Sequence, residues 1–295
     1  MPAEATLTLG AALAATMARF RAAGLDQPGL DARRLLAACC GLTPGEVLLR
    51  PEHGLTLAER HRLANLTERR LAHEPVSRIL GVRSFHGLEL EISPATLDPR
   101  PETETLVDGV LALIEQERVP GGRAPRILDL GTGSGAILLA LLHKLPEATG
   151  LGTDRSIAAL QLAARNAHTL GLQARCTFQQ SDWFAAVEGR FDVIVANPPY
   201  IPNRDIEHLA IDVRCYDPIT ALDGGVDGLD PYRVILSECG PHLRPGAWLA
   251  VEIGSDQQDA VVALARADQA SLWAERGVWQ DLSGKPRCVA FRHHA

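Results

Sequence analysis

The sequence predicts an α/β fold in which a doubly wound, mostly parallel sheet follows a small helical bundle. From Arg126 onward, short apolar segments alternate with helical patterns, as in sheets whose strands are joined by crossover helices. A glycine-rich loop over Gly131–Gly135 follows the first of these segments, whereas the first 75 residues show leucines at helical spacing. We therefore expect a helical domain over residues 1–75, a β-hairpin linker over 76–96 and an α/β domain over 97–295.

Composition narrows the class of protein. The 295 residues contain no apolar run long enough to cross a membrane, and the segment Met1–Glu4 lacks the basic start of an export signal. The six cysteines show no metal-binding spacing, so we expect reduced thiols in a cytoplasmic protein without a metal site. Of the net charge of −7, residues 1–75 contribute +1 and the rest −8, which argues against direct binding to nucleic-acid phosphates.

Four helices are expected in the first domain: over residues 6–24, from Pro28 to Gly41, after Thr43-Pro44, and from Thr56 to His73. The last of these is rich in arginine, which indicates either a solvated face or a docking surface. The linker shows two β-like pieces, Arg78–Leu80 and Phe85–Ile92.

A helix is expected from Pro101 to about Arg118, because proline suits the first helical turn. Arg100, just before it, is a candidate substrate-binding residue or a structural anchor of the preceding loop. Strands of the α/β domain are expected near 126–130, 149–153, 174–179, 191–196 and 246–253, with helices near 134–144, 156–170, 229–240 and 255–267. Segments 271–281 and 286–292 predict a closing antiparallel hairpin.

The glycine loop indicates a nucleoside-bearing cofactor. Its candidate contacts are Gly131, Thr132, Gly133, Ser134 and Gly135, since glycines permit close backbone approach and the next helix points free N–H groups there. Asp154, at the end of the second strand, can accept hydrogen bonds from ribose hydroxyls. The loop also passes as G-x-G-x-x-A, so the spacing alone leaves a nicotinamide cofactor open.

Two features favour S-adenosylmethionine. No lysine or arginine closely follows the loop, and Asp129 precedes it, where a carboxylate suits an ammonium group better than a pyrophosphate. Asp182 and Trp183, after the third strand, suit the amino edge and the face of an adenine. The structural alternatives are a helix N-cap for Asp182 and a core aromatic for Trp183.

The fourth strand, Phe191–Ala196, leads into Asn197-Pro198-Pro199-Tyr200. Two prolines hold the backbone extended, and neither can donate a hydrogen bond, so the strand ends in a rigid shelf. Asn197 and the carbonyl of Pro198 offer two acceptors for a planar NH₂ group, which the Tyr200 ring can cover. Asn197, Pro198 and Tyr200 are therefore candidate catalytic residues, and Pro199 is a candidate substrate contact. A proline-rich turn is the structural alternative.

Together, Asp129–Gly135, Asp154, Asp182-Trp183 and Asn197–Tyr200 resemble the S-adenosylmethionine-dependent methyltransferases that modify planar nitrogens. Within them the chain resembles, over nearly its whole length, the release factor glutamine methyltransferases (HemK/PrmC family).

The resemblance implies a class I methyltransferase fold, S-adenosylmethionine as cofactor, and class 1 peptide chain release factors as partners. The implied reaction is methylation of the side-chain nitrogen of glutamine in their Gly-Gly-Gln motif. It also implies cofactor contacts from Trp183 and Asn197. Asp98 departs from the family pattern, where an apolar residue is expected, which puts the packing of its loop in question.

Four alternatives remain open at this point. The same shelf serves adenine N6-methyltransferases acting on nucleic acid, and the motifs barely separate a release factor from a ribosomal-protein glutamine as substrate. The glycine loop alone is also compatible with a nicotinamide-dependent oxidoreductase and with a cofactor-binding protein without catalysis.

Overall fold

The computed structural model describes residues 7–117, 122–269 and 273–294. The chain divides into two compact units. The smaller runs to Gly81 and includes Ile211–Tyr216, and the larger contains Val82–Ala210 and the chain from Asp217 onward.

The smaller unit is a helical bundle. Its helices are α1 (Leu9–Ala22), α2 (Pro28–Cys40), α3 (Pro44–Leu49), α4 (Leu57–Leu71), α5 (Val76–Leu80) and α9 (Ile211–Arg214). Thr43 and Thr56 begin α3 and α4 with reciprocal side-chain to backbone capping bonds to Glu46 and Glu59. Leucines and Phe20 form the buried core.

Two arginines of α4 are engaged inside this bundle. Arg70 Nε donates to Asp31 at 2.7 Å, with both side chains largely buried, and Arg69 pairs with Glu74. The hydroxyl of Tyr216 donates to the carbonyl of Ala72 at 2.8 Å, which ties the segment after α9 to the end of α4.

The β-like piece expected at Arg78–Leu80 is wrong, because these residues belong to helix α5. Val76 and Ile79 are buried at helical spacing, and Gly81 ends the helix with φ 75°. The hairpin follows as β1 (Val82–Phe85) and β2 (Leu88–Glu91), joined by His86-Gly87 with positive φ at both residues.

A seven-stranded sheet forms the centre of the larger unit, in the order β5-β4-β3-β6-β7-β9-β8. Its strands are β3 (Arg126–Leu130), β4 (Thr149–Asp154), β5 (Cys176–Gln180), β6 (Phe191–Ala196), β7 (Leu243–Glu252), β8 (Trp273–Gln280) and β9 (Pro286–His293). The strands β3 to β7 are parallel, and β9 is antiparallel to β7 and β8, as the sequence predicts.

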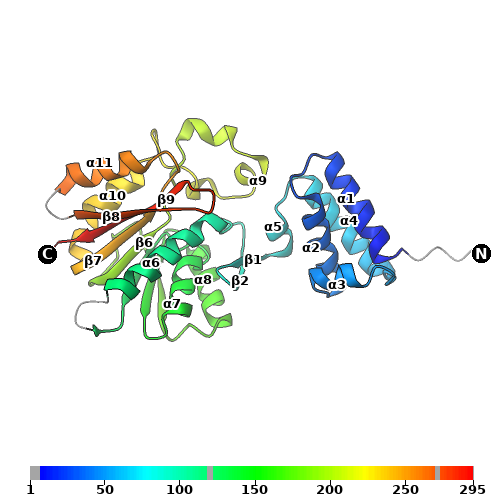
Figure 1. The fold of residues 1–295 in the computed structure, drawn as a ribbon, viewed down its shortest axis with the longest axis horizontal. Helices are drawn as coiled ribbons and strands as arrows, with labels where there is room; N and C mark the ends of the chain where they lie inside the picture. The colour runs from blue at the N-terminus through cyan, green and yellow to red at the C-terminus, as the bar shows by residue number, and fades with distance from the viewer. Residues whose placement is uncertain (1–6, 118–121, 270–272, 295) are drawn as a thin grey trace, which may run out of the picture. The chain divides into compact units, whose positions relative to one another are not determined.

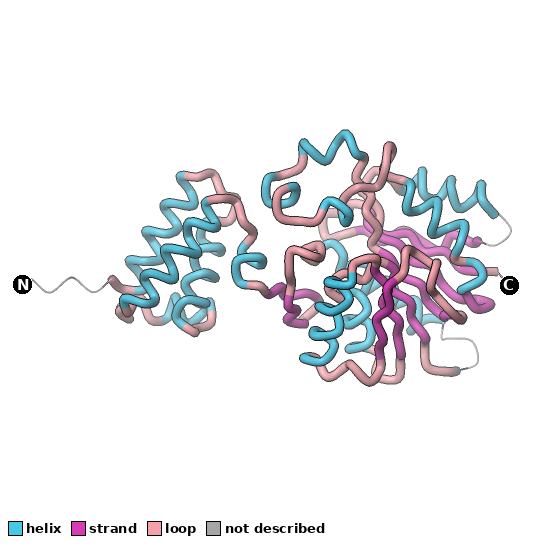
Figure 2. Tube along the Cα trace, turned by 180° about the vertical axis from the view of Figure 1, so that it is seen from behind, coloured by secondary structure: helices cyan, strands magenta, loops and turns pink. Residues whose placement is uncertain are grey.

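Helices cover both faces of this sheet (Figures 1 and 2). One face packs against α6 (Glu104–Glu117), α7 (Ala136–Lys144) and α8 (Ile157–Thr169), and the other against α10 (Asp230–Glu238) and α11 (Gln258–Gln269). Alternate residues of β6 enter the two cores, so the whole strand is buried, as expected for a central parallel strand.

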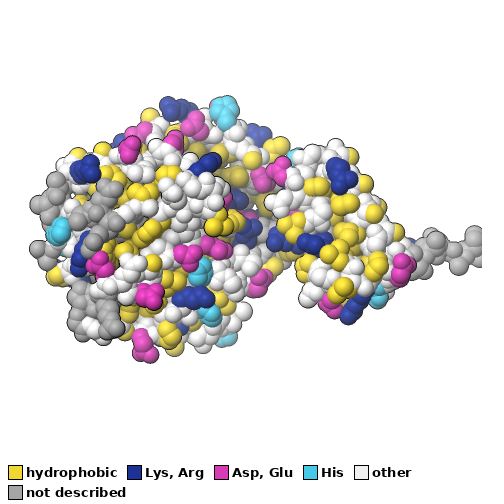
Figure 3. Space-filling model, viewed as in Figure 1, with side chains coloured by type: hydrophobic (Ala, Val, Ile, Leu, Met, Phe, Trp, Pro, Cys, Tyr) yellow, Lys and Arg dark blue, Asp and Glu magenta, His cyan; other side chains and the backbone are white. Residues whose placement is uncertain are grey.

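Two further properties of the described residues are the hydropathy of the helices and the distribution of charged side chains on the surface. No helix among them is long and apolar enough to cross a bilayer. On the face of the larger unit drawn in Figure 3, acidic and basic side chains are interspersed.

Candidate active site

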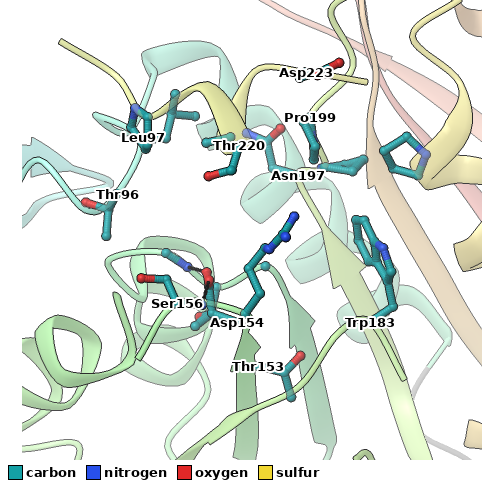
Figure 4. Close-up of a pocket in the computed structure, with 18 of the residues that line it drawn as sticks. Thr96, Leu97, Thr153, Asp154, Ser156, Trp183, Asn197, Pro199, Thr220 and Asp223 are labelled. Atoms are coloured by element: carbon teal, nitrogen blue, oxygen red, sulfur yellow. Dashed lines mark hydrogen bonds between the residues drawn. The ribbon is translucent and has the colours of Figure 1, made fainter. Parts of the chain in front are cut away.

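A cavity lies at the carboxyl edge of the sheet, where the neighbours β3 and β6 lead to opposite sides of the sheet. Ligands of open α/β sheets bind at such switch points. The cavity holds about 520 Å³, which falls within the range of small-molecule sites. Figure 4 shows its facing walls: one carries Asn197, Pro199, Thr220 and Asp223, and the other Thr153, Asp154, Ser156 and Trp183.

The glycine loop turns its backbone toward this cavity. Gly131 and Gly133 have φ of 68° and 56°, which side-chain-bearing residues rarely adopt. The amide of Thr132 donates to the carbonyl of Thr153 at 2.8 Å, so the loop folds over the end of β4. Gly135 instead caps α7 away from the cavity. The other four predicted loop residues line the cavity: Gly131, Thr132, Gly133 and Ser134.

Asp154 ends β4 and also lines the cavity. One carboxylate oxygen accepts from the amide of Gly133 at 3.0 Å, and the other from the amide of Ser156 at 2.8 Å. Because a carboxylate offers about four lone-pair sites, each oxygen keeps acceptor capacity for a ligand. The two backbone bonds therefore hold an acceptor pair in a fixed orientation.

Asp129 lies behind the loop and does not line the cavity. It is fully buried, and its carboxylate accepts from the Thr132 hydroxyl at 2.6 Å. Burial raises its pKa to about 7. Asp129 therefore stabilises the glycine loop through its hydrogen bond with Thr132.

Asp182 and Trp183 follow β5 and line the cavity. Trp183 has φ 47°, a strained value for a bulky residue, and the Ser181 hydroxyl holds this turn by donating to the Trp183 carbonyl at 2.8 Å. The indole also contacts the hydrophobic core, so Trp183 is both a packing residue and a wall of the cavity.

The shelf after β6 presents Asn197, Pro198 and Pro199 to the cavity. The carboxamide nitrogen of Asn197 donates to the Thr103 hydroxyl at 3.1 Å. The side chains of Thr103 and Asn197 both hydrogen-bond the carboxyl of Glu252. Glu252 is almost fully buried, and burial raises its pKa to about 7.

Tyr200 lies beside the cavity but is not among the residues that line it. Its ring packs against the core of β6 and α10, and burial raises the pKa of its hydroxyl to about 12. The side-chain nitrogen of Gln257 donates to the Tyr200 carbonyl at 2.9 Å, which fixes the end of the shelf. The expected contact between the ring and a substrate amide stays a prediction.

The charges around the cavity are mainly negative. Among the described residues that line it, Arg155 is the one basic side chain, against the carboxylates of Asp154, Asp182, Asp223 and Asp230. Such a surface repels a pyrophosphate and attracts a cationic ligand.

Comparisons with known proteins agree with this geometry. The model of the PrmC N-terminal domain matches residues 11–81, and that of the methyltransferase small domain matches residues 107–213. The release factor glutamine methyltransferase of Bradyrhizobium diazoefficiens is 48% identical over 93% of this chain and 91% of its own length. That of Rhodospirillum rubrum is 46% identical over 99% of this chain and 87% of its own. The chain belongs to the release factor glutamine methyltransferase family.

The class I methyltransferase fold expected of the family is confirmed. A methyltransferase structure from Pyrococcus furiosus matches with a TM-score of 0.52 at 19% identity, covering 79% of this chain and 100% of that one. At this identity the likeness concerns the fold alone.

In this member of the release factor glutamine methyltransferase family, Arg100 is tied to the protein. Its guanidinium pairs with Asp217, whose other carboxylate oxygen accepts from the amide of Asp98 at 3.1 Å, and Arg100 does not line the cavity. Asp98 is itself buried, 3.6 Å from the guanidinium of Arg83. Polar contacts thus hold this loop where the family pattern led us to expect an apolar side chain.

The sequence did not single out Thr103, Glu252 or Gln257. Thr103 lies 94 residues before Asn197, so only the fold brings their side chains together. The one local signal was an acidic residue directly after the apolar run of β7, a position where burial of a carboxylate needs an explanation.

Proposed function

We propose that this protein transfers the methyl group of S-adenosylmethionine to the side-chain nitrogen of the glutamine in the Gly-Gly-Gln motif of class 1 release factors. The observation that carries the proposal is the Asn197 carboxamide, set on a proline shelf beside the glycine loop and Asp154. The names of the relatives support the substrate. A substrate of this kind would place the enzyme in the cytoplasm, where translation ends.

The residues around the cavity fit this cofactor. Asp154 would accept from the two ribose hydroxyls, and Gly131–Ser134 would hold the methionine end through backbone groups. Asp182 and Trp183 would take the amino edge and the face of the adenine. The bound cofactor supplies an electrophilic methyl group on a positively charged sulfur, which suits the acidic lining better than a dinucleotide does.

The amide nitrogen of glutamine is a poor nucleophile, because its lone pair is delocalised into the carbonyl. The Asn197 side-chain oxygen and the Pro198 carbonyl would accept from its two N–H groups, which turns the lone pair toward the methyl group. The same acceptors stabilise the positive charge that develops on this nitrogen. No side-chain base is then needed, since a methylated, protonated amide is a strong acid that loses its proton to water.

Calorimetry and a substrate comparison test the proposal. We expect the protein to bind S-adenosylmethionine and not NAD, and to methylate an intact class 1 release factor. The comparison substrates are a glutamine-bearing ribosomal protein and an adenine-containing oligonucleotide. Methylation of the ribosomal protein in place of the release factor would show that the proposed substrate is wrong. Tight NAD binding would reject the methyltransferase assignment.

A further inference from the structure

Glu252 occupies an unusual place directly behind the shelf. In the parallel pairing of β6 with β7, Ala196 lies opposite Val251, so the next residues, Asn197 and Glu252, are also neighbours. Glu252 is 2% exposed, and the Tyr232 hydroxyl donates to its backbone carbonyl at 2.8 Å. A carboxyl group in such a position is costly unless it is hydrogen-bonded.

Thr103 hydrogen-bonds this carboxyl, and the charges of Arg287 and Glu102 also act on it. Thr103 ends the short 3-10 helix Pro101–Thr103 and is 3% exposed. The Thr103 hydroxyl accepts from the Asn197 carboxamide nitrogen at 3.1 Å and, like that nitrogen, hydrogen-bonds Glu252. Three side chains from three separate segments thus close a small hydrogen-bonded ring, while the Glu252 Oε2 atom is buried without a hydrogen-bond partner among the described residues.

This ring determines which end of the Asn197 carboxamide faces the cavity. The Asn197 carboxamide nitrogen faces the Thr103 hydroxyl at 3.1 Å. Above its pKa of about 7 the Glu252 carboxyl is ionised and only accepts hydrogen bonds, so it holds the NH₂ end of Asn197 on this side. A flipped carboxamide would set its oxygen against the carboxylate, in a surrounding of low dielectric where that repulsion is strong. The side-chain oxygen of Asn197 therefore faces the cavity. Hydrogen bonding of the Asn197 NH₂ group to a charged acceptor also polarises the carboxamide, which makes this oxygen a stronger acceptor.

We propose that Glu252 and Thr103 are positioning residues that fix the Asn197 carboxamide with its oxygen toward the substrate nitrogen. The proposal rests on the function proposed above, in which this oxygen accepts from the glutamine amide. Glu252 is not among the residues that line the cavity, whereas Thr103 is, and the role proposed for both is exerted through Asn197.

The first test compares Thr103→Val with Thr103→Ser, which keeps the hydroxyl. The valine variant should lose about tenfold in kcat toward a release factor, because one charge-assisted hydrogen-bond ring is opened. Its affinity for S-adenosylmethionine should stay at the wild-type value, and the serine variant should recover most of the rate. A valine variant with wild-type kcat would overturn the proposal.

A double-mutant cycle with Asn197→Ala separates positioning from general stability. If Thr103 acts through Asn197, then Thr103→Val should change kcat about tenfold in the wild type and hardly at all when Asn197 is alanine. An equal loss in both backgrounds would show that Thr103 supports the fold alone, and would reject the positioning role.

Glu252→Gln keeps the volume and removes the charge that the carboxylate carries above its pKa of about 7, so its rates are compared with wild type at about pH 8. We expect kcat to fall by about tenfold while the KM for release factor changes little, because the altered group acts on the transition state. Unchanged kcat in a folded variant would exclude Glu252. If the wild-type protein methylated no release factor at all, the proposed function would fail instead, and the cycle would show no rates to compare.

Discussion

Asp154 combines two roles in one side chain, since it holds the backbone of Gly133 and Ser156 and faces the cavity. We predict that Asp154→Ala weakens binding of S-adenosylmethionine by about 1.5–3 kcal/mol for each charged hydrogen bond lost. Isothermal calorimetry measures this. Asp154→Asn is the matched control, because it keeps one acceptor oxygen and the side-chain shape and should bind more tightly than the alanine variant. Equal affinity of wild type and Asp154→Ala would contradict the assignment to ribose.

Burial of Glu252 has a consequence for stability that can be measured without substrate. Its folded-state pKa of about 7 lies above the ordinary value of 4.5, so the folded protein binds more protons than the unfolded chain between these values. Its contribution to stability is therefore greatest below pH 4.5 and is lost as pH rises through about 7. The full effect corresponds to about 3 kcal/mol.

Denaturant unfolding of wild type and Glu252→Gln at several pH values checks this prediction. The difference in unfolding free energy between the two proteins should move in favour of the glutamine variant as pH rises from about 5 to 8. A difference that does not depend on pH would show that Glu252 does not titrate in this range. Asp129, whose pKa is also about 7, remains in both proteins and cancels in the difference.

The position of a residue at the edge of the sheet could be predicted from the sequence, but the direction of its side chain could not. Gly131, Asp154, Trp183 and Asn197 stand at strand ends, and the fold brings them to one cavity because parallel strands share a carboxyl edge. The sequence cannot tell whether a side chain points into the cavity or behind it. For that reason Asp129, placed beneath the loop, and Arg100, paired with Asp217, were candidates that do not line it.

Among the elements, the buried strands were the most predictable. The expected spans of β3 and β6 agree with the structure, because apolar runs between glycine or proline signals leave little choice of boundary. The strand prediction at Arg78–Leu80, after Pro75, was wrong, because the five residues of α5 are too short to show a clear hydrophobic period. Their two buried side chains lie three residues apart, which is helical spacing.

The segment 223–230 supports the shelf through backbone contacts. The amide of Gly224 donates to the carbonyl of Ile201 at 2.9 Å, and Gln257 bridges the carbonyls of Tyr200 and Gly228. Gly228 has φ 77°, and a Cβ on it would lie 2.4 Å from the Tyr200 carbonyl oxygen. Only glycine fits this approach.

We predict that Gly228→Ala lowers kcat by displacing the shelf while leaving most of the affinity for S-adenosylmethionine. The positive φ alone costs about 1 kcal/mol or more, and the contact with Tyr200 adds to it. Gly284→Ala is the control, because it has a similar φ of 76° but no atom within 4 Å of its Cβ position. The measurement is kcat toward a release factor for both variants. Equal values would show that segment 223–230 does not shape the site.

At the level of the whole molecule, the described residues of the smaller, helical unit include none that line the cavity, and this unit stays a proposed docking domain. A loop glutamine offers the shelf only an amide and two glycines, so remote contacts with the folded partner must supply specificity. The arginines first considered for this role are partly engaged internally, since Arg69 and Arg70 pair with acidic residues of the bundle.

We predict that a protein beginning near His73 binds S-adenosylmethionine but methylates intact release factor far more slowly than the full chain. The rates on a Gly-Gly-Gln peptide should be similar for both proteins, because the peptide has no remote contacts to lose. Tyr216, which donates to Ala72, loses its partner in the truncated protein, so Tyr216→Phe in the full chain is the control. An unchanged rate on intact release factor would make the bundle a structural appendage.

The most direct measurement is mass spectrometry of a class 1 release factor after incubation with S-adenosylmethionine and either wild type or Asn197→Ala. We expect wild type to add one methyl group, and fragmentation to place it on the glutamine of Gly-Gly-Gln. Asn197→Ala should do so about 10² to 10³ times more slowly, by analogy with the loss of one oxyanion-hole donor. A methyl group at another residue, or equal rates for the two proteins, would contradict the role given to the shelf.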